Sequence, residues 1–127
     1  NLKYVINFEM IGKEMQIGEN KVYLTGYEMS NLAQEINNVV PGFVTFFSKS
    51  KEFNLFQRSD NYPFYKVFNI PSQTLSSFDF ENYNYYHHVD DEVDYLDIKN
   101  LNNIITSSAF FISNFLNNKT KINLITN

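Results

Sequence analysis

The chain has 127 residues, of which 43% are hydrophobic and 19% charged, and its formal net charge is −4. This length is typical of one domain, and the 13 Phe and 9 Tyr residues argue against a disordered chain, because such chains are poor in aromatic residues. Lys and Arg together number only 10, which disfavours a dedicated nucleic-acid-binding protein, and the absence of Cys excludes disulfide scaffolds and thiolate metal sites.

The first half of the chain alternates between predicted strands and a predicted helix. Residues 4–10 (YVINFEM) form an apolar run of strand length that carries apolar residues at both odd and even positions. This pattern predicts a central strand that is covered on both faces. A second strand over residues 21–25, a helix over 28–38 and a third strand over 43–47 follow, and residues 49–58 are predicted to be a polar, charged loop.

The second half of the chain ends in its clearest amphipathic pattern. Ser59 is a plausible N-cap for a short helix that reaches about residue 68, with Pro63 in the first turn. A fourth strand is predicted over residues 72–76, followed by an irregular segment. The pattern from Ile98 to Leu116 predicts a long helix with Asp97 as its cap, and the tail from residue 119 to 127 is expected to fray.

Two conclusions follow from the order of these elements. Strands that alternate with helices predict an α/β layered fold. The longest run without charge, residues 100–118, contains six Asn, so no membrane-spanning helix is predicted.

The segment from Asp79 to Asp97 is the most unusual in charge. It contains seven of the 14 acidic residues and both histidines, His87 and His88, and no Lys or Arg occurs between Lys66 and Lys99. Such a negative field attracts cations, and imidazole is a common zinc ligand. A solvated acidic loop with two surface histidines is the alternative.

Few other residues suggest a catalytic or ligand-binding role. Glu9 lies near the carboxyl end of the first predicted strand, where sites gather in open α/β sheets, although a solvent-facing residue there is the plainer alternative. Asp60 and Asn61 equally suit the first turn of a helix. The chain has no Gly-x-Ser-x-Gly elbow, and its four glycines are too scattered for a phosphate-binding or dinucleotide-binding loop.

Three patches together resemble one family. Residues 5–12 (VINFEMIG) are similar to the "N-[LF]-[DE]-M-I-G" strand of the zinc aminopeptidases of metallopeptidase family twenty-eight. Residues 58–64 (RSDNYPF) and 69–71 (NIP) resemble the family's "SDH-x-PF … G-[IV]-P" segment, and residues 86–91 (YHHVDD) resemble its "YH-T-x-DD" segment. Their order and separations also agree, and the resemblance extends from about residue 4 to residue 117.

The resemblance implies a fold and a mechanism. The expected fold is part of a three-layer α/β sandwich, with a mixed, mostly parallel sheet and helices on both faces. Two zinc ions share a water that a Glu activates, and this water attacks the first peptide bond of a substrate with a free N-terminus. Glu9 and His87 match terminal ligands of different zinc ions, and the implied neighbours of the metals or substrate are Asp60, Asn61, Tyr86, His88 and Asp91.

The departures from the family pattern concern single positions and whole motifs. Glu9 stands where Asp is commoner, Asn61 replaces a His and His88 replaces a Thr. The family's upstream His-x-Asp and Glu-Glu motifs, which supply three ligands and the general base, have no counterpart. We therefore expect residues 1–127 to be the C-terminal portion of a catalytic domain, without a catalytic residue of its own and with weak or no zinc binding alone.

The missing portion also bears on partners and on alternative functions. The strand over residues 4–10 is expected to expose an edge that pairs with the missing N-terminal half or with a second copy of the chain. Two alternatives to the aminopeptidase remain open, namely a glutaminyl cyclase-like enzyme with a single zinc and a non-catalytic binding or dimerisation module of the same fold. Members of the family are often exported, but the sequence leaves the compartment open.

Overall fold

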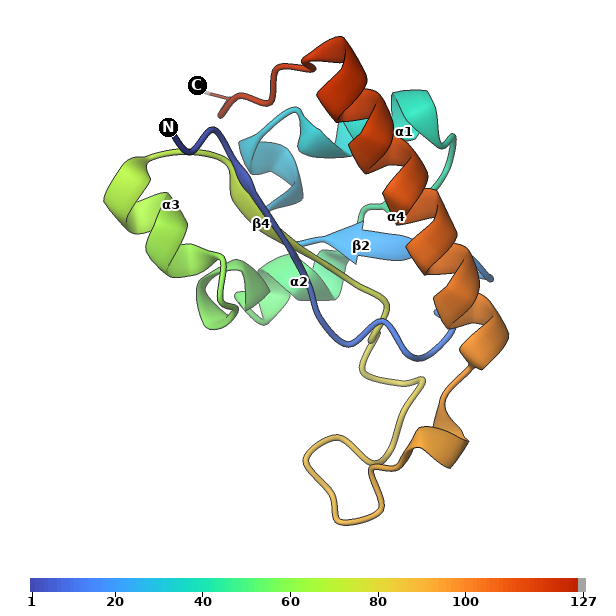
Figure 1. Ribbon diagram of the computed structural model, residues 1–127. Coiled ribbons are helices and arrows are strands. Elements are labelled where there is room, and N and C mark those ends of the chain that lie inside the picture. The colour runs from blue at the N-terminus through green and yellow to red at the C-terminus, as the bar shows by residue number, and fades with distance from the viewer. Residues whose placement is uncertain (126–127) are drawn as a thin grey trace.

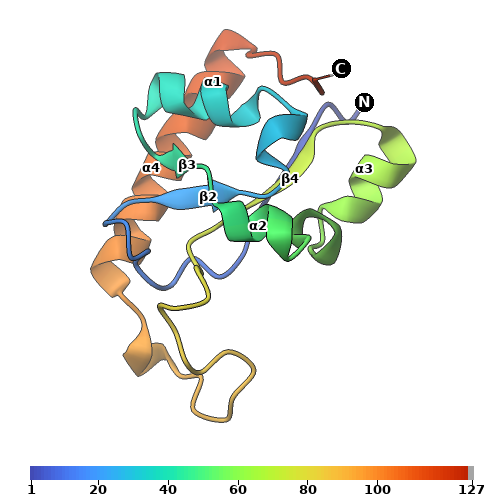
Figure 2. The same ribbon diagram turned by 180° about the vertical axis from the view of Figure 1, so that it is seen from behind.

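The computed structural model describes residues 1–125 and is built around a four-stranded sheet (Figures 1 and 2). The strand order is β1-β4-β2-β3, in which β1 pairs with β4 and β2 with β3 in parallel, whereas β2 and β4 are antiparallel. The expected α/β fold with a mixed, mostly parallel sheet is confirmed. The strands are β1 (Val5–Phe8), β2 (Val22–Leu24), β3 (Val44–Thr45) and β4 (Ser72–Ser76).

Within residues 1–125, four α-helices accompany the sheet. The last of them, α4, runs along the molecule for 21 residues and is followed by its C-cap, Lys119, which adopts a left-handed conformation with φ of 50°. No helix among residues 1–125 has both the length and the apolar character that crossing a membrane requires. The helices are α1 (Leu32–Val39), α2 (Ser48–Glu52), α3 (Tyr62–Phe68) and α4 (Ile98–Asn118), and single 3-10 turns occur at Tyr27–Met29, Leu55–Arg58 and Val93–Tyr95.

The two faces of β4 have different neighbours. Leu75 is completely buried in the hydrophobic core, with residues of α1 and α4. The preceding residue, Thr74, is also completely buried, but its hydroxyl donates a hydrogen bond to Asn61 beside α3. Because successive side chains of a strand point to opposite faces, helices lie on both faces of this sheet.

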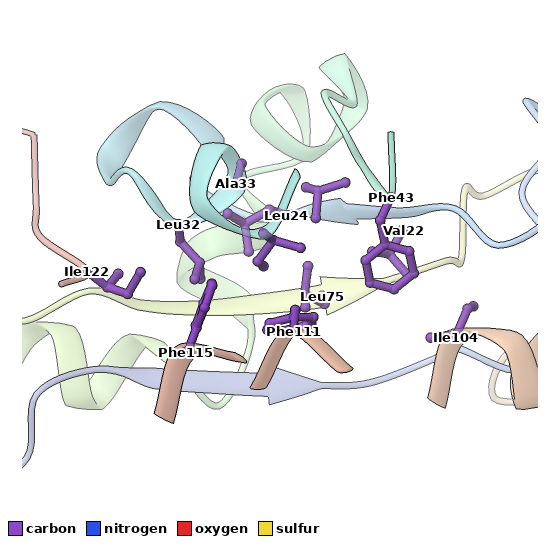
Figure 3. Packing of buried hydrophobic residues seen from close by; sticks show 12 residues of the cluster. Val22, Leu24, Leu32, Ala33, Phe43, Leu75, Ile104, Phe111, Phe115 and Ile122 are labelled. Atoms are coloured by element: carbon purple, nitrogen blue, oxygen red, sulfur yellow. The ribbon is translucent and has the colours of Figure 1, made fainter. Parts of the chain in front are cut away.

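The hydrophobic core fills the space between the sheet and the pair α1 and α4 (Figure 3). On α4 the buried apolar residues recur at helical spacing, which places Ile104, Phe111 and Phe115 on one face. The rings of Phe43 and Phe111 lie 6.3 Å apart between centroids. The cluster comprises Val22, Leu24, Leu32, Ala33, Ile36, Phe43, Val44, Leu75, Ile104, Phe111, Phe115 and Ile122.

Two predicted local structures are corrected. The helix predicted over residues 28–38 is interrupted at Ser30, which is extended and whose hydroxyl donates to Gln73 and accepts from the N–H of Leu32. The loop predicted over residues 49–58 instead contains most of α2 and a 3-10 turn. Its aromatic residues pack, with Phe56 in edge-to-face contact with Tyr65 of α3.

The position of β1 is a third correction. In the part of the chain that the structure describes, the strand ends the sheet and has only β4 as a neighbour, and its residues are half-buried rather than covered on both faces. The N–H groups of Val5 and Glu9 donate to Pro71 and Leu75 on the β4 side. By the alternation of a strand, the N–H groups of Ile6 and Phe8 face the open edge.

The C-terminal tail packs against the molecule instead of fraying over residues 119–125. Ile122 is buried in the core, Leu124 forms a bridge with Ser30, and the N–H of Ile125 donates to Met29. Residues 126–127 lie outside the described residues.

Candidate functional site

Glu9 directly follows β1, at the edge of the sheet where the carboxyl ends of β1 and β4 meet. Both oxygens of its carboxylate accept hydrogen bonds, Oε1 from the Ser59 hydroxyl at 2.8 Å and Oε2 from the Asn7 amide at 3.2 Å. Asn7 lies two residues earlier, on the same face of the strand. These two donors restrict the orientation of the half-buried carboxylate.

A buried polar network connects Glu9 to the interior. The Asn7 amide also donates to the Thr74 hydroxyl at 3.0 Å, and that hydroxyl donates to Asn61 Oδ1 at 2.8 Å. The Asn61 amide in turn donates to the carbonyl of Ser72 at 2.8 Å. Asn61 is completely buried, so it acts on the site through Thr74 and Asn7 and does not contact a ligand directly.

A cavity of about 90 Å³ lies beside Glu9. One side comes from the ends of the strands, another from the 3-10 turn Leu55–Arg58, and a third from the segment after β4. Glu9 and Arg58 are its charged lining residues. The remaining lining residues are Met10, Tyr23, Thr25, Leu55, Ser59, Thr74, Ser76, Phe78, Phe80 and Tyr86.

Tyr23 is a buried residue that forms part of one wall of this cavity. The Tyr23 hydroxyl donates to the carbonyl of Phe78 at 2.8 Å, which links β2 to the segment after β4. Burial raises the pKa of Tyr23 to about 12, and the nearby carboxylates of Glu9 and Asp79 also raise it. Tyr23 therefore stays neutral and acts as a hydrogen-bond donor over the whole neutral range.

The segment with the histidines follows β4 at the same edge of the sheet. Tyr86 lines the cavity and stacks on Phe78, with ring centroids 5.4 Å apart. The exposed ring of His87 stacks on the ring of Tyr86, with the two ring centroids 4.0 Å apart. The backbone of His87 has a φ of 56°, which is uncommon for a residue with a side chain. His87 therefore contacts Tyr86, which lines the cavity, but does not line the cavity itself.

The other predicted residues have different surroundings. His88 Nδ1 accepts the N–H of Asp90 at 3.1 Å, and its ring is exposed. Asp91 accepts the hydroxyl of Tyr83, and this hydrogen bond raises the pKa of Tyr83 to about 12. Asp60 is exposed and does not line the cavity.

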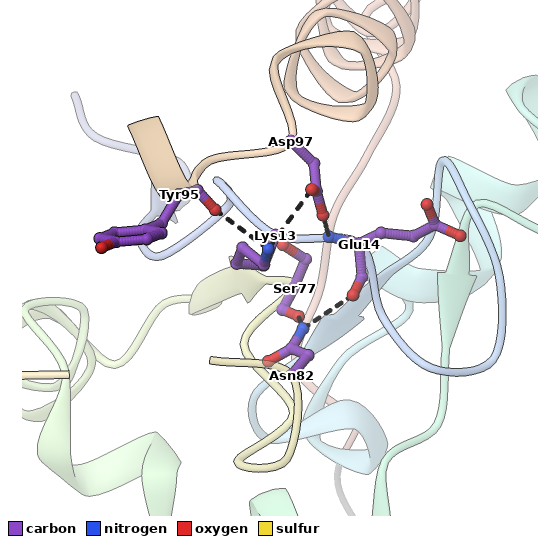
Figure 4. A network of polar contacts seen from close by, with 6 residues as sticks. All are labelled: Lys13, Glu14, Ser77, Asn82, Tyr95 and Asp97. Carbon is purple, nitrogen blue, oxygen red and sulfur yellow. Dashed lines mark hydrogen bonds and ion pairs between the residues drawn. The ribbon is translucent and has the colours of Figure 1, made fainter. Parts of the chain in front are cut away.

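A set of hydrogen bonds, which we call the polar clamp, holds both ends of the segment with the histidines against the residues that follow β1 (Figure 4). Lys13 Nζ donates to the carbonyl of Tyr95 at 3.0 Å, and the N–H of Glu14 donates to Asp97 Oδ2 at 2.7 Å. The Asn82 amide bridges the carbonyls of Glu14 and Ser77. Asp97 occupies the N-cap position of α4, as predicted, but its side chain makes no capping hydrogen bond and belongs to the clamp instead.

The residues do not amount to a complete metal site. Within residues 1–125, no three His, Asp or Glu side chains are grouped so that they could hold a metal ion. A catalytic zinc normally has three protein ligands. The part of the chain described by the structure therefore does not fit a zinc site by itself.

Several contributors to this site had no clear sequence signal. Asn7 could have been found from its spacing, since it lies two residues before Glu9 on the same face of a strand. Ser59 was interpreted as a helix cap, yet its hydroxyl donates to Glu9 and to the carbonyl of Leu55. Tyr23 and Thr74 lie at the site only because their strands, β2 and β4, pair in the sheet. The sequence does not reveal this pairing.

One comparison with known proteins agrees with the resemblance. The family model described as "Peptidase family M28" matches residues 1–112. No curated protein and no solved structure matches the chain. The matched region contains the whole sheet, Glu9 and His87, and so the chain belongs to this metallopeptidase family, whose members are zinc-dependent hydrolases.

Proposed function

We propose that this chain is the C-terminal portion of the catalytic domain of a zinc-dependent aminopeptidase. The observation that supports the proposal is the placement of Glu9, whose carboxylate is oriented by Ser59 and Asn7 at the sheet edge where the segment with His87 also begins. Glu9 and His87 remain the candidate ligands of this chain. The other ligands and the general base belong to a portion outside it.

The cavity beside Glu9 is suited to the substrate. Its walls combine aromatic side chains with hydroxyl groups, a mixture that is common in sites for small ligands. We assign to it the side chain of the residue that the enzyme removes. Its volume of about 90 Å³ favours one side chain over a longer stretch of peptide.

The first experiment is a calorimetric titration of the 127-residue chain with zinc. We expect weak binding or none, because Glu9 and His87 alone cannot replace the three ligands that hold a catalytic zinc. Two tight sites per chain would contradict the division of the site that we propose.

The second experiment assays the longer protein that contains this chain, loaded with zinc. We expect hydrolysis of peptides with N-terminal Leu and loss of that activity in Glu9→Ala, with Glu19→Ala as a control outside the cavity. Ring closure of N-terminal Gln without hydrolysis would favour the cyclase-like alternative. Inactivity towards both substrates would favour a non-catalytic module.

We also propose that the open edge of β1 pairs with another strand, supplied by the rest of the domain or by a second copy of the chain. Unpaired strand edges associate readily, and the N–H of Ile6 faces this edge. Light scattering of the isolated chain should show association that increases with concentration. Ile6→Pro should reduce it, because proline removes the outward N–H without removing a hydrogen bond between β1 and β4.

Ile6→Ala is the matched control for this variant, since it shortens the same side chain and keeps the N–H. It should associate more strongly than Ile6→Pro. A wild-type chain that stays monomeric at every concentration would contradict self-association.

A further inference from the structure

Arg58 is the one positively charged residue that lines the cavity beside Glu9. It is also the only arginine of the chain, and it ends the 3-10 turn Leu55–Arg58. No hydrogen bond or ion pair engages its guanidinium among residues 1–125, although all five of its N–H groups can donate. The acidic residue of the same cavity, Glu9, makes no ion pair with it and accepts from Ser59 and Asn7 instead.

We propose that Arg58 makes this cavity selective for a carboxylate, namely the side chain of an N-terminal Glu or Asp. The inference rests on the proposed aminopeptidase function and adds the class of residue removed. A guanidinium binds a carboxylate through two parallel hydrogen bonds, a geometry that a neutral amide side chain cannot match in strength. A cavity of about 90 Å³ admits a short acidic side chain, and Arg58 is the cationic residue of its lining.

The acidic segment after β4 does not cancel this attraction. Two of its carboxylates have their own donors: Asp79 accepts from the N–H groups of Gln16 and Glu81, and Asp97 accepts from Lys13 and Glu14. None of the acids between residues 79 and 97 lines the cavity in the described chain. Of the two charged lining residues, Glu9 and Arg58, only Arg58 can therefore pair with a carboxylate.

The single arginine allows a direct test by NMR. The ¹⁵N-labelled chain has one arginine Nε–Hε signal, which needs no assignment. We expect this signal to shift saturably with glutamic acid α-amide, which keeps the side-chain carboxylate, and not with glutaminamide, which has no carboxylate. Glutamine, which offers only the α-carboxylate, should bind at least tenfold more weakly, about the difference that one charged contact makes.

Two variants distinguish the effect of the charge on Arg58 from the effect of the net charge of the chain. Arg58→Met should lower the affinity for glutamic acid α-amide, followed through backbone signals of Glu9 and Tyr86, by roughly tenfold or more. Lys99→Met changes the net charge equally at an exposed position on α4 and should bind like the wild type. An unmoved Nε–Hε signal, or equal shifts with glutamine and glutamic acid α-amide, would overturn the proposal.

The longer protein provides a kinetic comparison. Its kcat/KM should favour anilides of Glu over those of Leu, and Arg58→Met should lower this ratio about tenfold. Hydrolysis without any preference for an acidic residue would overturn the role of Arg58 alone. Absence of hydrolysis of any N-terminal residue would overturn the proposed function, and the NMR titration would still decide whether Arg58 binds a carboxylate.

Discussion

Phe111→Ala is expected to lower the free energy of unfolding by about 3–5 kcal/mol, the range for removing a fully buried Phe from a core. Phe111 is 0% exposed and lies where α4 meets the rest of the core, beside Phe43 and Phe115. Its loss leaves a hole that these neighbours cannot fill without leaving their own contacts. Urea denaturation followed by circular dichroism measures the change.

The adjacent residue provides the control. Phe110 is 61% exposed and lies outside the buried face of α4, so Phe110→Ala should change stability by less than about 0.5 kcal/mol. Similar losses from both variants would contradict the assignment of the buried face. A chain of this length is stable by only about 5–15 kcal/mol, so Phe111→Ala could leave a large part of it unfolded at 37 °C.

The elements that were predicted well have strong local patterns. The strand over residues 72–76 is observed with these bounds, and the long helix from Ile98 is observed as α4. The pattern overstated the apolar face of that helix, because Ile105 and Leu116 are exposed. Periodicity identifies a helix, but the neighbours of its flanking apolar residues decide which of them are buried.

The elements that were missed depend on distant contacts. The interruption at Ser30 comes from its hydrogen bond to Gln73 and its bridge to Leu124, and both partners are far away in the sequence. The short helix α2 lies in a polar stretch that has no amphipathic repeat of its own. Its neighbour Phe53 is in edge-to-face contact with Phe80, a contact that a local pattern cannot show.

The candidate site, like the fold, could be predicted only in part. The position of Glu9 at the carboxyl end of a strand was predictable, because the apolar run of β1 ends there. Its orientation was not predictable, because the donor Ser59 is 50 residues away in the sequence. Asn61 was assigned near the metals or substrate from the resemblance, and the structure buries it completely as part of the support for Glu9.

Asn61→Asp should therefore have a large effect despite its equal size. The Asn61 amide donates to the carbonyls of Ser72 and Phe56, at 2.8 and 3.3 Å, and a carboxylate would place a negative oxygen against both. A buried group that loses its donors costs about 1–3 kcal/mol and a charged one more, so we expect a loss of about 3 kcal/mol or more at pH 7. Thermal denaturation followed by circular dichroism measures it.

The pH dependence of that loss identifies its cause. Protonation restores a donor towards Ser72, so the new carboxyl should have a higher pKa in the folded than in the unfolded chain. Its stabilising contribution is then present at low pH and lost as the pH rises through the folded pKa, so the deficit relative to the wild type should grow between about pH 4 and pH 7. Asn102→Asp, at an exposed position of α4, should show no such growth. A deficit that does not depend on pH would mean that packing, and not the donor from Asn61 to Ser72, supports this side of the site.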